Sequence, residues 1–162
     1  MPLPSSPDAI PQAFADAWNA RDPDALAALF DSDATFVSIV GLWWHDREAI
    51  RAAHAYGLRE LFSESRLRVG RRVVKDLAPG VALVQARMRL DGQTALGGVA
   101  QPGVRHTVFS FVAREITEAG RVVGWRCASG HNTDVVAGAE THIRDTDGRL
   151  LGADYRSGRV SS

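Results

Sequence analysis

The sequence is poor in the residues and segments on which several large classes of protein depend. It contains one cysteine, Cys127, which cannot form an intrachain disulfide, and zinc sites built from several cysteines are excluded as well. No apolar run approaches the ~20 residues that a helix needs to span a bilayer. Residues 1–7 have neither the basic start nor the apolar core of a signal peptide. These absences predict a reduced, cytoplasmic protein with no membrane partner.

The chain also lacks an excess of charge of either sign. Its 19 basic and 19 acidic residues give a formal net charge of zero, so nothing draws the whole molecule to nucleic acid or to an anionic surface. The only basic cluster covers residues 66–75, where Arg66 and Arg68 alternate with apolar residues as on a solvated strand face. We therefore expect no nucleic-acid partner.

The common signatures of cofactor use are missing too. The sequence has no Walker loop, no Gly-x-Gly-x-x-Gly, no His-Glu-x-x-His and no Gly-x-Ser-x-Gly. Its five histidines follow no local metal-binding spacing. We accordingly expect no bound cofactor and no metal.

What is present is an ordinary globular composition. The 162 residues are 45% hydrophobic and 23% charged, enough for one domain that is not disordered. A chain of this length buries roughly two thirds of its unfolded surface and needs no covalent staple.

The first third of the chain predicts helices. Apolar residues recur at helical spacing over residues 10–18, and Asp22 followed by proline is typical of a new helix start. We expect this second helix to end at residues 31–33 and a strand to follow over residues 35–40. Asp46 is placed to cap a third helix that continues to about residue 62.

The rest of the chain predicts strands. Glycine and small residues mark a loop over residues 91–103, and a turn sequence lies at residues 118–120. Helices followed by hairpin-linked strands indicate an α+β fold with an antiparallel sheet. The expected strands cover residues 67–74 with a bulge at Gly70, 81–90, 106–116 and 122–132, and a small hairpin is expected over residues 141–155.

One of these strands is apolar on both faces. Val108 and Val112 alternate with Phe109 and Phe111, so if the helices cover one face the other needs a second cover. A homodimer packed sheet to sheet would supply it.

His54 is the most informative candidate for chemistry. It lies four residues from both Ile50 and Leu58, so its ring points where the apolar face of the helix points. Two interpretations stay open: a core histidine bonded to a backbone carbonyl, or an acid, base or hydrogen-bond donor that lines a pocket.

His131 is the second candidate. By strand alternation it shares a face with Trp125 and Cys127, and Asn132 follows it at the strand end. It is either part of a polar cluster that closes the sheet or part of a site, since sites are often placed at strand ends.

Three further groups of side chains have both a structural and a functional interpretation. Trp18, Trp43 and Trp44 are either a wall for an aromatic ligand or ordinary packing. Asn19 is either a helix-end residue or a ligand contact, and the Ser38 hydroxyl, if buried, needs a partner that a ligand could supply.

Several runs of residues together resemble a known family. These are residues 14–22, 26–30, 33–37, 41–44, 47–54 and 131–133. In order and spacing they are similar to the NTF2-like (SnoaL-like) superfamily, and most similar to its SgcJ/EcaC family. The resemblance covers about residues 10–132.

The resemblance implies a cone-shaped fold in which a curved antiparallel sheet wraps around N-terminal helices and encloses an apolar pocket. It implies a domain over residues 8–137, with a C-terminal tail over residues 138–162. Relatives often pack as dimers through their sheets and bind small molecules. A carboxylate general base, which the isomerases and cyclases of the superfamily use, has no counterpart among the acids of this sequence.

The activity that the resemblance implies is cofactor-independent chemistry of the isomerase, cyclase or hydrolase type on a hydrophobic polyketide- or enediyne-like compound. The alternatives are a non-catalytic ligand carrier and a structural dimerisation module. The implied catalytic residues are His54 and His131. The implied ligand-binding residues are Trp18, Asn19, Ser38, Trp43, Trp44, Thr107, Trp125 and Asn132.

Overall fold

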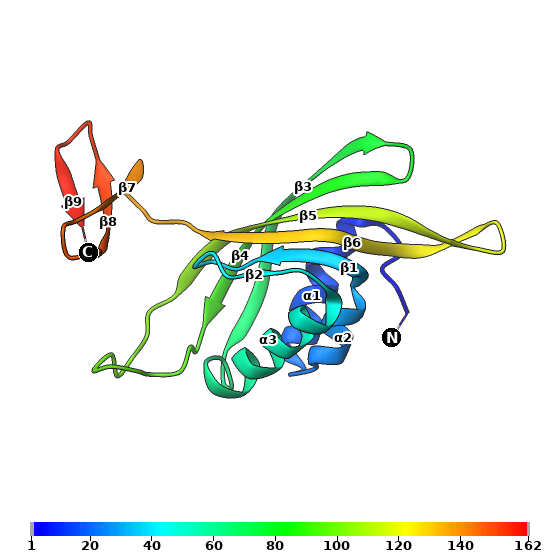
Figure 1. Ribbon diagram of the computed structural model, residues 1–162, viewed down its shortest axis with the longest axis horizontal. Helices are drawn as coiled ribbons and strands as arrows, with labels where there is room; N and C mark the ends of the chain where they lie inside the picture. The colour runs from blue at the N-terminus through cyan, green and yellow to red at the C-terminus, as the bar shows by residue number, and fades with distance from the viewer. Residues whose placement is uncertain (1, 162) are drawn as a thin grey trace.

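The computed structural model describes residues 2–161 as helices packed against one side of a curved sheet, with a small second sheet beyond it (Figure 1). The helices are a short 3-10 turn at Pro7–Ala9, α1 (Ile10–Asn19), α2 (Pro23–Ala28) and α3 (Arg47–Glu60). The strands of the main sheet are β1 (Phe30–Val37), β2 (Trp43–Trp44), β3 (Arg66–Ala78), β4 (Val81–Asp91), β5 (Arg105–Glu118) and β6 (Arg121–Asp134). The α+β architecture predicted from the sequence is confirmed.

The two predicted helix caps are present. The Asp22 side chain accepts a hydrogen bond from the Ala25 backbone at 2.8 Å, and Asp46 accepts one from the Ala49 backbone at 2.7 Å. Each carboxylate satisfies a backbone N–H that has no partner within the first turn of its helix. The caps therefore fix where α2 and α3 begin.

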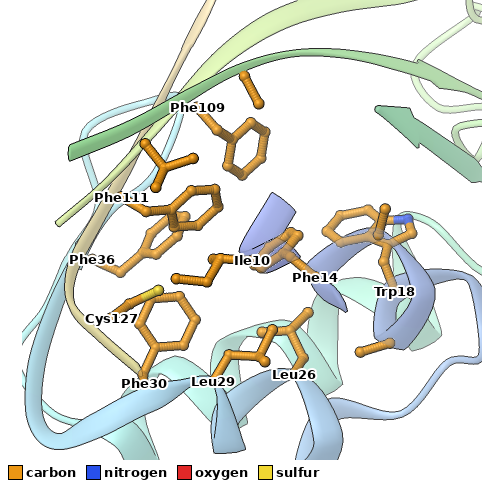
Figure 2. Packing of buried hydrophobic residues seen from close by; sticks show 14 of the residues in the cluster. Ile10, Phe14, Trp18, Leu26, Leu29, Phe30, Phe36, Phe109, Phe111 and Cys127 are labelled. Carbon is orange, nitrogen blue, oxygen red and sulfur yellow. The ribbon is translucent and has the colours of Figure 1, made fainter. Parts of the chain in front are cut away.

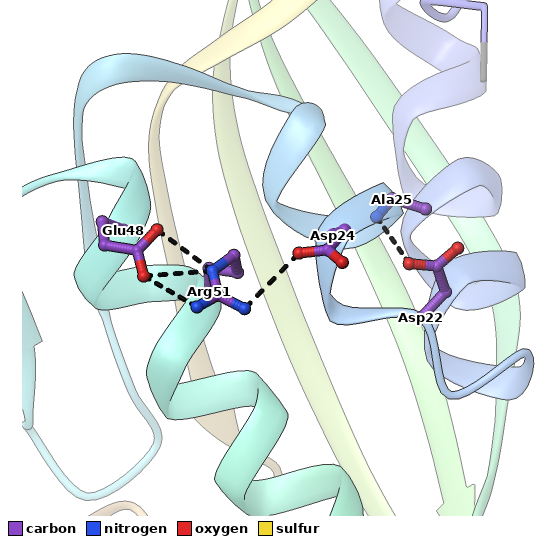
Figure 3. Close-up of polar contacts among 5 residues, drawn as sticks. All are labelled: Asp22, Asp24, Ala25, Glu48 and Arg51. Atoms are coloured by element: carbon purple, nitrogen blue, oxygen red, sulfur yellow. Dashed lines mark hydrogen bonds and ion pairs between the residues drawn. The ribbon is translucent and has the colours of Figure 1, made fainter.

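A surface ion cluster joins these two helices (Figure 3). Arg51 of α3 lies 2.8 Å from Glu48 one turn earlier and 3.4 Å from Asp24 of α2. All three side chains are solvent-exposed, so the cluster contributes little to stability.

The boundary between α2 and β1 differs from the prediction. Residues 31–33, expected to end the helix, lie inside β1, and the strand ends at Val37 rather than at residue 40. Tertiary contacts set both boundaries. The strand begins early because Phe30 already pairs with Cys127 of β6. It ends at a turn in which the Ser38 N–H donates to the Leu42 carbonyl at 2.8 Å.

The main sheet has the strand order β2-β1-β6-β5-β4-β3. Its neighbours are antiparallel except β1 and β6, which run parallel, so the sheet is mixed where a wholly antiparallel one was expected. The register of β3 on β4 shifts between Val69 and Arg72, which confirms the bulge predicted at Gly70.

The core lies between the helices and the inner face of the sheet (Figure 2). Phe14 of α1 stands at its centre, with ring centroids 5.3 Å from Phe109 and 5.7 Å from Phe111. Gly130 of β6 lies directly under Phe36, and a Cβ there would come within 2.6 Å of that ring. The absence of a side chain at this position is what lets the Phe36 ring lie against the sheet.

The tail forms the second sheet, built from β7 (Thr141–Arg144), β8 (Leu150–Asp154) and β9 (Arg159–Ser161). β7 and β8 form a hairpin, and an extended segment after β6 carries this sheet away from the main body (Figure 1). Only Gly152 and Ala153 are buried in it, while Ile143, Leu150 and Val160 are exposed.

Candidate functional site

A cavity of about 120 Å³ lies between α3 and the inner face of the sheet. Its walls are mostly aromatic and aliphatic, with a few polar groups among them. The lining residues are Phe14, Trp18, Phe36, Ser38, Ile39, Trp44, Ala53, His54, Gly57, Leu58, Phe62, Leu67, Leu90, Arg105, Thr107, Phe109 and Asn132. This volume is below the ~300–1,000 Å³ of a pocket for a drug-sized ligand. It is close to the ~150 Å³ of a cavity that accepts benzene.

His54 is the titratable side chain that α3 contributes to the wall of the cavity. It is 8% exposed, and its Nδ1 lies 2.8 Å from the Ile50 carbonyl oxygen one turn earlier. A carbonyl can only accept, so Nδ1 carries the proton and Nε2 has a free lone pair. Within residues 2–161 no protein group bonds to Nε2.

The surroundings of His54 keep it uncharged. Its ring meets those of Phe36, Trp44 and Phe14 edge to face, at centroid distances of 5.5, 5.6 and 5.7 Å. Burial among these rings lowers its pKa from 6.5 to about 4, because the charged form loses its hydration, and the bond to the Ile50 carbonyl only partly offsets this. His54 is therefore a neutral hydrogen-bond acceptor at physiological pH.

Both interpretations of His54 are thus realised at once. One nitrogen is bonded to a backbone carbonyl, as in a core histidine, and the ring nonetheless lines a cavity.

Trp18 and Trp44 form part of the aromatic wall. The Trp18 indole N–H donates to the Ser65 hydroxyl at 3.0 Å, and that hydroxyl donates to the Phe62 carbonyl at 2.8 Å. This chain of bonds fixes the indole plane. Trp44 stacks on Phe36 with centroids 5.7 Å apart.

The polar residues on the sheet side are Thr107 and Asn132. Thr107 on β5 is buried, and Asn132 on β6 pairs across the sheet with Phe109. The side-chain oxygen of Asn132 is buried and has no hydrogen-bond partner among the described residues. A buried acceptor without a partner is costly, so it favours an occupant that can donate to it.

Arg105 and Ser38 also line the cavity, but each already has a partner. Arg105 Nε lies 3.4 Å from an Asp134 carboxylate oxygen. The Ser38 hydroxyl accepts from the Leu42 backbone N–H at 3.0 Å, so the turn after β1 supplies the partner that a ligand was expected to supply. No sequence signal marked Arg105, because nothing in a strand-start arginine indicates a cavity.

The predicted placement of His131 is wrong. It is exposed and pairs with Ser110 on the outer face of the sheet. Val112 pairs with Ser129 but Ala113 pairs with Cys127, so Ala128 is an extra residue on β6. A bulge of one residue inverts the alternation beyond it, so Asn132 faces the cavity in place of His131.

Three other predicted ligand contacts lie elsewhere. Trp43 is 61% exposed, because successive residues of β2 point to opposite faces and Trp44 takes the inner one. Trp125 is buried where its backbone bonds to Pro4 and does not line the cavity. Asn19 bonds to both backbone groups of Leu67, at 2.8 and 2.9 Å, and so joins α1 to β3.

A buried carboxylate exists, but it lies outside the cavity. Asp31 on β1 is 4% exposed and receives two hydrogen bonds from Arg114, at 2.6 and 3.0 Å. The pair raises the pKa of the Arg114 guanidinium above its ordinary value, chiefly through the hydrogen bond. Asp31 was expected to end a helix; its burial depends on the strand pairing that the sequence pattern did not predict.

Residues 2–161 hold neither a metal-binding cluster nor a membrane-spanning helix. No group of three or more His, Cys, Asp or Glu side chains is arranged to hold a metal ion. No helix in this part of the chain is long and apolar enough to cross a membrane.

Comparison with known proteins identifies the family of the chain and its structural neighbours. The chain matches the family model of the SnoaL-like domain over residues 12–125. Among curated proteins, none matches it significantly.

Solved structures provide the other matches. An uncharacterised protein with a cystatin-like fold from Caulobacter vibrioides is 29% identical with a TM-score of 0.69, over 80% of this chain and 87% of that one. A domain of unknown function from Nostoc punctiforme PCC 73102, also with a cystatin-like fold, is 23% identical with a TM-score of 0.65, over 80% and 75%. A ketosteroid isomerase-like protein from Erwinia carotovora atroseptica SCRI1043 is 12% identical with a TM-score of 0.61, over 79% and 92%. The last two matches show similarity of fold alone.

Proposed function

Since the chain belongs to the SnoaL-like domain family, we propose that it binds a hydrophobic small molecule in the cavity between α3 and the sheet. The observation that carries the proposal is the combination of aromatic walls with two acceptor atoms, His54 Nε2 and the Asn132 side-chain oxygen, that have no partner among the described residues. Such an arrangement is typical of a ligand site, where apolar walls provide affinity and a few polar groups fix orientation. A cone filled by its own side chains, as in a purely structural module, would leave no such space.

We extend the proposal to the ligand's class and to its chemistry. The residue pattern favours the SgcJ/EcaC branch, and with it a polyketide- or enediyne-like compound and a cytoplasmic location. If the protein is an enzyme, His54 Nε2 is the proton acceptor, because no carboxylate from residues 2–161 lines the cavity. His131, on the outer face, has no part in it.

The second candidate is a binder that catalyses nothing. The observation in its favour is the pKa of His54, lowered to about 4, since a general base works best with a pKa near the operating pH. A ligand that stabilises the imidazolium would be needed to make His54 an effective base.

Filling the cavity tests the binding proposal. Ala53 lines the cavity from α3, and its neighbour Ala52 is exposed on the same helix. Ala53→Leu and Ala52→Leu therefore make the same chemical change inside and outside the site. We expect aromatic ligands, followed by the fluorescence of Trp18 and Trp44, to bind the wild type and Ala52→Leu equally and to lose at least about tenfold in affinity for Ala53→Leu. Equal affinity for all three proteins would place binding elsewhere.

Turnover separates the two candidates once a ligand is known. His54→Phe keeps a ring in the wall but removes the acceptor. A positioned general base is worth about 10²–10⁴-fold, so a loss of that size in turnover with binding retained supports the enzyme. Binding without product in the wild type supports the carrier.

We also propose that the protein is a homodimer packed through the outer face of its sheet. Leu83, Val108 and Val112 lie on this face and are only partly buried in one chain. Light scattering of the wild type should give twice the chain mass, and Val112→Glu should halve it. A monomeric wild type would end this part of the proposal.

A further inference from the structure

Two acceptor atoms that line the cavity, one on His54 and one on Asn132, have no partner among the described residues. His54 must place its proton on Nδ1, because the group facing that nitrogen is the Ile50 carbonyl, and its other nitrogen is then a lone pair. The unpartnered buried atom of Asn132 is also an oxygen. An occupant that satisfies them must bring hydrogen-bond donors of its own.

The size and walls of the cavity restrict the occupant further. At about 120 Å³ the cavity is slightly smaller than the ~150 Å³ cavity that accepts benzene, so it limits the occupant to one six-membered ring at most. Phe36, Trp44 and Phe14 surround His54 with ring edges and faces, and such surfaces pack well against another aromatic ring. A larger molecule can place one ring here and extend outward.

The two unpartnered acceptor atoms disfavour an anion. The imidazole presents a lone pair, and an anionic ligand would lose its hydration without gaining a donor from either acceptor. Among the described residues, Arg105 is the one arginine or lysine in the lining, and its Nε lies 3.4 Å from an Asp134 carboxylate oxygen, which offsets its charge. Thr107 contributes a hydroxyl, which can serve as donor or acceptor.

We propose that the cavity selects an uncharged ligand that carries a hydroxyl group, or another donor, on a six-membered ring, and that the donor bonds to His54 Nε2. The hydroxyl proton faces the lone pair of His54, while the ring lies among the aromatic side chains. This inference rests on the proposed function, because it names the class of ligand that the same cavity would take.

Three simple probes test the selectivity. Toluene, phenol and benzoate are close in size and differ in having no donor, a neutral donor, and a negative charge without a donor. At pH 7 phenol is uncharged. One hydrogen bond of ordinary net strength predicts that phenol binds the wild type about 3- to 10-fold more tightly than toluene, and that benzoate binds most weakly. Affinities can be measured by titration followed by NMR.

Two matched variants assign the preference to one residue. His54→Phe removes the acceptor and keeps an aromatic ring, whereas His45→Phe makes the same change at an exposed position that does not line the cavity. We expect the preference for phenol over toluene to vanish in His54→Phe and to persist in His45→Phe. If His54→Phe does not fold, the wild type provides the readout: phenol, but not toluene, should shift the ¹⁵N resonance of His54 Nε2.

The outcomes separate this inference from the function on which it rests. Equal affinity for toluene and phenol overturns the selectivity and leaves the binding proposal standing. If benzoate binds more tightly than phenol, the inferred selectivity is wrong and Arg105 determines which ligand binds. A preference for phenol that survives in His54→Phe, or an Nε2 resonance that phenol leaves unmoved, overturns the role of His54. Failure of all three probes and of larger aromatic ligands overturns the proposed function itself.

Discussion

The low pKa of His54 predicts that acid destabilises this protein through one residue. In the unfolded chain a histidine titrates near 6.5, whereas burial in the cavity wall holds the pKa of His54 at about 4. The unfolded state therefore binds a proton at a higher pH than the folded state does. The stability that the neutral His54 provides is present above pH 6.5 and is lost as the pH falls toward 4.

The magnitude follows from these two values. At pH 5 the unfolded histidine is almost fully protonated and the folded one only about one-tenth, which costs about 2 kcal/mol of unfolding free energy relative to pH 8. Below pH 4 the full loss approaches ~3 kcal/mol, since one unit of pKa is worth about 1.4 kcal/mol. Against a typical domain stability of about 5–15 kcal/mol this is a large effect.

Urea unfolding of the wild type and His54→Phe at pH 8 and pH 5 measures the loss of unfolding free energy that His54 causes. The two proteins differ only at residue 54, so the contributions of all other groups cancel when the two pH dependences are subtracted. The wild type should lose about 2 kcal/mol more than the variant. Parallel losses would refute the reasoning, as would an NMR titration in which the His54 ring protons move with a midpoint near 6.5.

Three further predictions concern the scaffold. Gly130→Ala forces a methyl group into the Phe36 ring and should lower the unfolding free energy by about 1–3 kcal/mol, whereas Gly103→Ala, which meets open space, should not; chemical denaturation distinguishes them. Asp31→Asn weakens the charged hydrogen bonds that the half-exposed Arg114 donates to the buried Asp31, and should cost about 1–3 kcal/mol by the same assay. The exposed Asp33→Asn is the control, and equal effects of the two substitutions would contradict a stabilising role of the Asp31 carboxylate. Removal of residues 138–162 should change the unfolding free energy of the main body by less than about 1 kcal/mol, because β7–β9 pair only with one another; a larger loss would place the domain boundary elsewhere.

The features of the fold that follow from local chemistry were predictable from the sequence. Asp22 and Asp46 mark the starts of α2 and α3, because a short carboxylate side chain can accept a hydrogen bond from a free backbone N–H in the first turn. The inward residues of β4 follow from strict alternation, and Val84, Ala86 and Met88 are indeed buried. Gly70 marked the bulge in β3. Each of these signals acts within a few residues of the chain.

The features that depend on distant strands were not predictable in this way. Residues 31–33 resemble a helix end, yet the pairing of Phe30 with Cys127, far along the chain, makes them part of β1. The parallel pairing of β1 with β6 has the same origin. No local pattern distinguishes an aspartate that ends a helix from Asp31, which lies buried beside Arg114.

The bulge at Ala128, which the sequence did not predict, decides which side chains line the site. Ala128 carries no signal of a bulge, yet the bulge there decides whether His131 or Asn132 reaches the cavity. It also brings Gly130 under Phe36, which in turn supports Trp44 and packs against His54. With His131 inside, the cavity would hold two imidazoles and could divide acid and base roles between them. With Asn132 inside, it has a single neutral imidazole and an amide, so the chemistry it favours is recognition of a donor rather than proton transfer between two histidines.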